Sequence, residues 1–251
     1  MDIHVWQIIT VFFLAFGASV FSGMAGGGGG FIILPVLIAM GLSPQQAVAT
    51  MKVSGFGLIT GSVTAFRGRA FSNRRLLIYL TALAFGVSLF VPHIFRQLNG
   101  HTFQIVLGIL LLILAPVVLK EKTRLRERRT TVPQKAVGSL LMVVVLFLQG
   151  VFSGGVGSLN NILLISFFGL TALEANAMRR VITLALNTFV VLALVLTTHF
   201  IVYKLAVSGL LGSFIGGYIG SEIALKKGER FAQVALVVFM LVSGVWLLAT
   251  A

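Results

Sequence analysis

The sequence contains no cysteine and only six acidic side chains among its 251 residues. Without cysteine the chain can form no disulfide, thiolate metal site or cysteine nucleophile. Charged residues are also scarce, at 10% against 58% hydrophobic residues, whereas a soluble domain carries about 25% charged residues. Uncharged apolar stretches such as 3–51 and 142–173 exceed the roughly 20 residues that a membrane-spanning helix needs. The composition therefore excludes a soluble domain and predicts an all-α polytopic membrane protein.

The chain also lacks the residue patterns of common enzyme classes. It has no His/Asp/Glu spacing typical of a metal site, no HExxH motif, no Gly-Lys-Ser/Thr of a nucleotide-binding loop and no pair of central carboxylates. We therefore expect no enzymatic activity and no cofactor. With 19 basic residues the net charge is +13. In a membrane protein, an excess of basic residues indicates which loops lie in the cytoplasm, and we do not take it as a sign of nucleic-acid binding. The expected partners are a small anionic substrate and membrane lipids, with the oligomeric state left open.

The hydrophobic pattern predicts ten helical segments, at 5–22, 29–41, 44–66, 76–95, 103–119, 136–153, 159–169, 172–197, 204–225 and 231–249. Segments 29–41 and 159–169 are too short to cross a hydrocarbon core of about 30 Å at about 1.5 Å per residue. Each follows a glycine-rich break, so we expect each to form a bent hairpin with the segment before it. The predicted fold has about eight spans, with two broken or hairpin helices.

The distribution of basic residues predicts the orientation of these segments. Fourteen of the 19 lysines and arginines lie in 67–75, 120–135 and 226–230. Because cytoplasmic loops are enriched in Lys and Arg, we expect these loops in the cytoplasm and both termini outside. We expect a multi-pass protein of the plasma membrane, with a bacterial inner membrane favoured. Segment 120–135 is then a basic cytoplasmic linker between 1–119 and 136–251, which we favour over a binding site for anionic lipid or nucleic acid.

The two halves of the chain resemble each other at a nearly constant shift. Residues 21–23 and Gly26 match 152–154 and Gly157 at a shift of 131, and from 41 to 103 the matches keep a shift of 128. Since segments 44–66 and 172–197 are expected to run in opposite directions, the halves are predicted to be inverted repeats. Such repeats are a transporter architecture with the substrate site near the membrane midplane. A duplicated scaffold that transports nothing is the alternative.

Two glycine-rich breaks carry the signal of a binding site. A helix is expected to follow each break, so its free N–H groups and positive dipole end would form an anion site. Close packing of small residues is the alternative, which we prefer for Gly212, Gly216 and Gly220. The candidate ligands from the two breaks are Ser22, Gly26, Gly27, Gly28, Gly29, Gly30, Ser153, Gly157, Ser158, Asn160 and Asn161.

Two basic residues are expected in the middle of the membrane. Ser43 and Thr171 have the pattern of helix N-caps, with Gln or Glu three residues later, so Glu174 is expected to cap its helix. Lys52 and Arg180 each follow the cap by nine residues. At about 1.5 Å per residue both approach the midplane from opposite faces, where a cation is by default a functional hypothesis. No carboxylate is predicted at that depth, so a bound anion would neutralise them.

Polar residues after Arg180 extend this candidate substrate site. Thr183 and Asn187 follow it by three and seven residues, which places them on the same helix face. Two alternatives stay open. Lys52 can extend towards the membrane surface instead. Arg179 can face inward in place of Arg180, and the repeat alignment is the only reason to prefer Arg180.

The same residues carry a family resemblance. The glycine run followed by 31–35 (FIILP) and 41–47 (GLSPQQA), with its repetition after the basic linker, resembles the sulfite exporter TauE/SafE family, also called TSUP. The resemblance covers about residues 10–249. It implies an eight-span transporter of small sulfur-containing anions such as sulfite, sulfoacetate or related organosulfonates. The second half departs from the pattern, with Ser158, Asn160 and Asn161 at glycine positions and Ser166 where Pro35 would map.

These observations predict a secondary transporter of a small sulfur-containing anion, with the repeats alternating around a midplane site. Export is the expected direction, because an interior-negative potential favours outward movement of a monoanion by about 2.3 kcal/mol per 100 mV. An anion channel and a non-transporting membrane assembly or binding protein are the alternatives.

Overall fold

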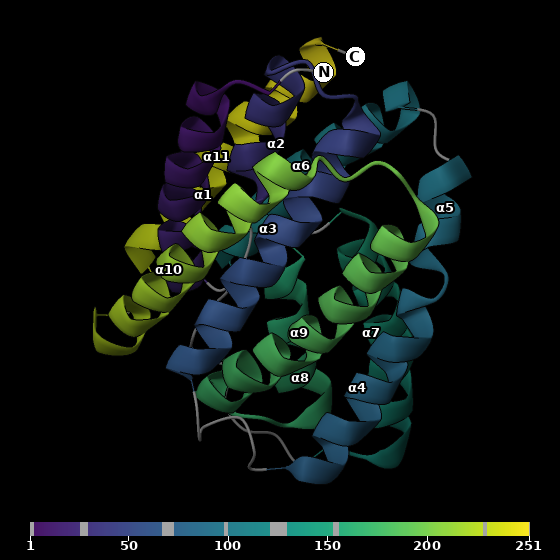
Figure 1. Cartoon of the computed structure of the whole chain (residues 1–251). Coiled ribbons are helices and arrows are strands. Elements are labelled where there is room, and N and C mark those ends of the chain that lie inside the picture. The colour runs from purple at the N-terminus through teal and green to yellow at the C-terminus, as the bar shows by residue number, and fades with distance from the viewer. Residues whose placement is uncertain are drawn as a thin grey trace.

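The computed structural model describes residues 3–25, 30–66, 73–97, 100–120, 130–152, 156–227 and 230–250. These residues form eleven α-helices and no strand (Figure 1), which confirms the all-α prediction. The helices are α1 (Val5–Ala25), α2 (Gly30–Ala39), α3 (Pro44–Ala65), α4 (Arg74–Ser88), α5 (Val91–Gln97), α6 (Gly100–Lys120), α7 (Val132–Phe152), α8 (Gly157–Phe168), α9 (Ala172–Thr197), α10 (Tyr203–Lys227) and α11 (Arg230–Ala249).

The two short helices of the sequence analysis are present. Helix α2 has 10 residues and α8 has 12, so at 1.5 Å per residue they are about 15 and 18 Å long. Neither is long enough to cross a hydrocarbon core of about 30 Å. The breaks before them, at 26–29 and 153–155, lie outside the described residues. So does most of the predicted basic linker, since α6 extends to Lys120 and α7 begins at Val132.

The predicted segment 76–95 is not one continuous helix. It is divided into α4 and α5 by a turn at Leu89 and Phe90. The second residue of α5 is Pro92, which has no backbone N–H to donate to the carbonyl of Ser88. A proline is tolerated in the first turn of a helix, where the N–H would be free in any case, and the chain therefore starts a new helix there.

Four described helical stretches are long and apolar enough to cross a membrane, namely Val5–Met24, Arg74–Ile94, Val132–Val151 and Leu173–Thr197. Shorter apolar helices occur at Gln104–Pro116, Gly157–Phe168 and Val237–Ala249. Large hydrophobic side chains such as Phe13, Ile78, Leu140, Leu196 and Val242 lie on the outside, while many polar groups are buried. This arrangement suits a polytopic protein surrounded by lipid.

Helices α1, α3 and α10 run parallel and pack closely through glycines. On α10, Gly212, Gly216 and Gly220 lie against the backbone carbonyls of residues 12, 16 and 20 in α1, with no room for a Cβ. On α3, Gly57 and Gly61 lie in the same way against carbonyls of residues 210 and 214 in α10. The structure therefore confirms that the glycines of α10 serve helix packing.

The two halves of the chain are interleaved rather than separate. Helix α10 from the second half packs on α1 and α3, while α4 from the first half packs on α7 and α9. In Figure 1, α1 and α10 lie on the left of the molecule, and α4 and α7 lie on the right. Helices α3 and α9 also touch and run in opposite directions. Arg180, near the start of α9, lies against Phe66 at the end of α3, whereas Val202, just after α9, bonds Thr50 near the start of α3.

Candidate functional site

The capping boxes that fix the starts of α3 and α9 are both present. The Ser43 hydroxyl accepts from the N–H of Gln46, and the Gln46 side chain accepts from the N–H of Ser43. Thr171 and Glu174 make the equivalent pair at α9. Glu174 is thus a cap, as predicted. Because these caps set the first residues of the two helices, Lys52 and Arg180 are each the ninth residue of their helix.

Lys52 is completely buried, so its side chain does not extend to the surface. Its Nζ donates to the backbone carbonyl of Gln149 at 3.0 Å and to that of Gly150. Both carbonyls belong to the last turn of α7, where no intrahelical donor is available. The ammonium group also lies at the negative end of the α7 dipole. Lys52 therefore joins α3 of the first half to the end of α7 in the second half.

Arg179 and Arg180 are both buried, each 4% exposed, so both face the interior. Arg180 donates to the Gly23 carbonyl at 2.9 Å and to the Ser221 hydroxyl at 3.0 Å, and its guanidinium lies 4.3 Å from the centre of the Phe66 ring. Gly23 is in the last turn of α1. Arg180 thus mirrors Lys52, since it joins α9 of the second half to the end of α1 in the first half.

Two asparagines at the start of α8 connect these cations. Asn160 donates to the side-chain oxygen of Gln149 at 2.5 Å, and the Gln149 amide donates to Thr183 at 3.0 Å. Asn161 accepts from Nε of Arg179 at 3.0 Å. Asn176 accepts from Arg179 at 2.8 Å and from Arg180 at 3.2 Å. We call this set the buried polar cluster: Lys52, Gln149, Asn160, Asn161, Asn176, Arg179, Arg180, Thr183 and Ser221.

The start of α8 is a buried helix end that no described side chain caps. Its N-cap residue is Val156, which is fully buried and makes no side-chain capping bond. Gly157 and Ser158 form its first turn and are also buried. The first N–H groups of a helix have no partner within the helix, and they favour negative charge. By contrast, α3 and α9, which begin at more exposed positions, both have capping boxes.

The remaining predicted residues lie around the cluster or outside the described part. Ser22 is buried beside Gly23, and its hydroxyl has no hydrogen-bond partner among the described residues. Gly30, the first residue of α2, lies against Met51, the neighbour of Lys52. Asn187 is buried one turn beyond Thr183. Four glycines and one serine fall outside the described residues, namely Gly26, Gly27, Gly28, Gly29 and Ser153.

Three cluster members were not predicted from the sequence. Asn176 is four residues before Arg180, and that helical spacing is a signal that would have found it. Gln149 and Ser221 are isolated polar residues in apolar segments and carry no spacing signal of their own. The pairing of both cations with backbone carbonyls was also missed, because it depends on how the halves pack.

The buried polar cluster has three cationic side chains and no carboxylate among its members. Among the described residues, the Oδ1 atom of Asn160 is buried and has no hydrogen-bond partner. In the described part of the chain, no group of three His, Asp or Glu residues is close enough to hold a metal ion. Cationic side chains, amide donors and an uncapped helix start suit the binding of a small anion.

Comparison with known proteins gives a consistent match. The family profile described as sulfite exporter TauE/SafE matches residues 11–247. A "Probable membrane transporter protein" of Haemophilus influenzae is 26% identical, covering 95% of this chain and 93% of its own length. The probable membrane transporter protein YfcA of Escherichia coli is 24% identical, covering 91% of this chain and 85% of its own length. The probable membrane transporter protein YjnA of Bacillus subtilis is 29% identical, covering 90% and 94%. No solved structure gives a significant match.

Proposed function

Because the chain belongs to the sulfite exporter TauE/SafE family and is therefore a membrane transporter, we propose that it exports a small sulfur-containing anion. Sulfite and organosulfonates such as sulfoacetate are the proposed substrates. The proposed site is the buried polar cluster together with the start of α8. It needs no cofactor, and the transporter acts as a secondary carrier in the plasma membrane.

The observation that carries this proposal is the uncapped, buried start of α8 between the two groups of cations. Asn160 connects it to the helix end that holds Lys52, and Asn161 connects it to Arg179. An oxyanion has several acceptor oxygens, which match N–H donors of the helix start and of the cations. A fixed positive field without a carboxylate also selects against cationic solutes.

The reciprocal contacts between the halves support alternating access. In the described conformation Lys52 holds the end of α7 and Arg180 holds the end of α1, and both cations are buried from either side of the membrane. We propose that this is an occluded state. Opening then requires one half to rock against the other, so that one of these cation–carbonyl contacts is exchanged for a contact with the substrate.

The direct test is transport of labelled sulfite by the purified protein in proteoliposomes. We expect saturable flux that is accelerated by unlabelled sulfite on the opposite side, and net efflux that increases with an interior-negative potential. Sulfoacetate, thiosulfate, taurine and chloride serve as competitors that define the substrate. Non-saturating flux without counter-exchange would indicate a channel, and absence of flux with every anion would indicate an assembly or binding protein.

A charge variant within the site makes this test specific. Gln149→Glu keeps oxygens that can accept from Asn160 and from the Thr183 hydroxyl, but it adds a negative charge beside the proposed anion. We expect sulfite affinity to fall about tenfold or more, because like charges in close contact cost several kcal/mol. Gln134→Glu is the matched control, since Gln134 is exposed on the same helix. Its side-chain oxygen accepts from the Thr131 N–H, which a glutamate can also do. Unchanged affinity in Gln149→Glu would contradict the proposed location.

A further inference from the structure

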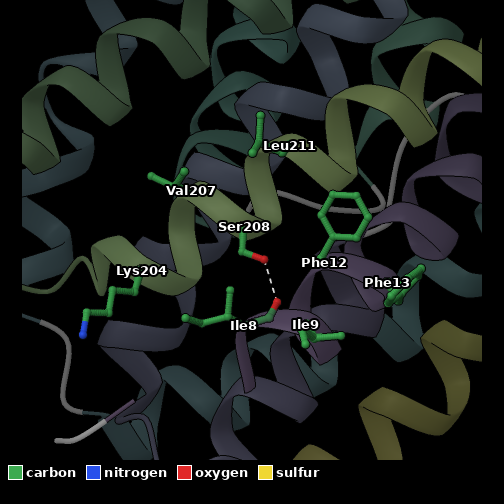
Figure 2. Close-up of a pocket in the computed structure, with 8 residues that line it drawn as sticks. All are labelled: Ile8, Ile9, Phe12, Phe13, Lys204, Val207, Ser208 and Leu211. Atoms are coloured by element: carbon green, nitrogen blue, oxygen red, sulfur yellow. Dashed lines mark hydrogen bonds between the residues drawn. The ribbon is translucent and has the colours of Figure 1, made fainter. Parts of the chain in front are cut away.

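A groove on the lipid-facing side of the protein lies between the first halves of α1 and α10. Its volume is about 370 Å³, within the range of ligand-binding pockets. Figure 2 shows Lys204 at one edge, with its ammonium group directed away from the apolar side chains. The residues that line the α1–α10 groove are Ile8, Ile9, Phe12, Phe13, Lys204, Val207, Ser208 and Leu211.

The walls of the groove are apolar and open to the surrounding membrane. Ile9, Phe13, Val207 and Leu211 are each more than half exposed. The one hydroxyl in the groove, that of Ser208, donates to the Ile8 carbonyl at 2.6 Å (Figure 2) and so presents no free polar group. From residue 204 to residue 211 the groove follows about 10 Å of helix, roughly two-thirds of one leaflet's hydrocarbon depth. These dimensions suit part of a lipid acyl chain.

Lys204 gives one end of the groove a positive charge that the described protein does not neutralise. It is the second residue of α10, where a cation is opposed by the positive end of the helix dipole. The two described carboxylates are engaged elsewhere, because Glu174 caps α9 and Glu222 lies 3.7 Å from Lys226. The free N–H groups in the first turn of α10 add to the attraction for an anion.

We infer that the α1–α10 groove is a binding site for one anionic phospholipid. An acyl chain lies along the apolar walls, and the phosphate lies at the start of α10 beside Lys204. A basic side chain at a membrane-helix end next to an apolar groove is the chemistry that distinguishes an anionic from a zwitterionic headgroup. The site is separate from the buried polar cluster and does not depend on the transported substrate.

The test is native mass spectrometry of the purified chain titrated with phosphatidylglycerol or phosphatidylcholine of identical acyl chains. We expect the wild-type protein to bind one phosphatidylglycerol about fivefold more tightly than phosphatidylcholine, the preference that one interfacial lysine provides. Lys204→Gln should abolish this preference, whereas Lys204→Arg should keep it. Lys135→Gln, which removes an exposed lysine at the start of α7, should have no effect.

A second variant tests the groove itself. Val207→Trp fills it from an exposed position and should reduce binding of both lipids, with the thermal unfolding temperature in detergent as the folding control. The inference is overturned if Lys204→Gln retains the preference, if glycerol phosphate binds as tightly as the lipid, or if Val207→Trp leaves both lipids bound. It is also overturned if Val207→Trp instead separates a dimer of the wild-type chain, since the groove would then hold a second copy.

Discussion

Lys52 and Arg180 occupy equivalent positions in the two halves but are held in different ways. Both are the ninth residue of a capped helix, and each reaches the last turn of a helix from the opposite half. Within the described part of the chain, Lys52 bonds only backbone carbonyls. Arg180 bonds the Gly23 carbonyl and the side chains of Ser221 and Asn176, and it shares Asn176 with Arg179. The first half thus concentrates its positive charge on one group, whereas the second half distributes it over two.

This difference follows from the chemistry of the two side chains. An ammonium group is a compact charge with three donors, which suits two adjacent carbonyls at the end of a helix. A guanidinium has five donors in one plane and can join several partners at once. We therefore expect the Lys52 position to depend on the charge alone, and the Arg180 position to depend on the shape of the group.

The largest effect is expected from Lys52→Gln. The amide is shorter and uncharged, so it leaves two buried carbonyls at the end of α7 without their partner. Each orphaned buried acceptor costs about 1–3 kcal/mol, so thermal stability in detergent should fall clearly. Sulfite flux in proteoliposomes should fall about a hundredfold or more, as expected for loss of several kcal/mol at the site.

The matched control for this variant is Lys135→Gln, which removes an equal charge from an exposed position on α7. It should leave stability and flux unchanged. Wild-type flux in Lys52→Gln would show that the charge of Lys52 is not part of the transport site, and would make the two halves functionally unequal.

A smaller effect is expected from Arg180→Lys, which keeps the charge and changes the shape. Lysine cannot reproduce the simultaneous contacts with Asn176, Ser221 and Gly23. Loss of one hydrogen bond to a charged group removes about 1.5–3 kcal/mol, so flux should fall about tenfold. Arg75→Lys on the exposed face of α4 is the control. Unchanged flux in Arg180→Lys would contradict the dependence of this position on the shape of the guanidinium.

Local sequence patterns predicted the parts of the fold that local forces determine. The caps at Ser43 and Thr171 were predicted from four-residue motifs, because a capping box needs only residues three positions apart. The short lengths of α2 and α8 followed from apolar runs between glycines and loops. The burial of Lys52 followed from counting helical residues after its cap. The turn at Phe90 was missed, because a hydrophobic pattern continues through it and only Pro92 indicates a break.

The contacts between the two halves could not be predicted from the sequence. Backbone carbonyls occur at every residue, so nothing in the sequence indicated that those at the ends of α1 and α7 would accept hydrogen bonds from Arg180 and Lys52. Gln149 was missed for a related reason, since its role depends on the approach of α8. The opposite directions of α3 and α9 support the predicted inverted repeat, which stays a prediction together with the amide ligands of 26–29.

The smallest effect, and the sharpest contrast with the cluster, is expected at the cap of α9. Thr171→Ala removes the hydroxyl that accepts from the Glu174 N–H at 3.2 Å and should lower stability by about 1 kcal/mol. Because Glu174 is a cap and not a transport residue, sulfite affinity should not change. Thr188→Ala is the control, because the Thr188 hydroxyl donates to the Leu184 carbonyl of its own helix. Thermal unfolding and counterflow measured on the same preparations separate the two properties. A loss of sulfite affinity in Thr171→Ala would contradict the conclusion that the Thr171–Glu174 pair serves only to cap α9.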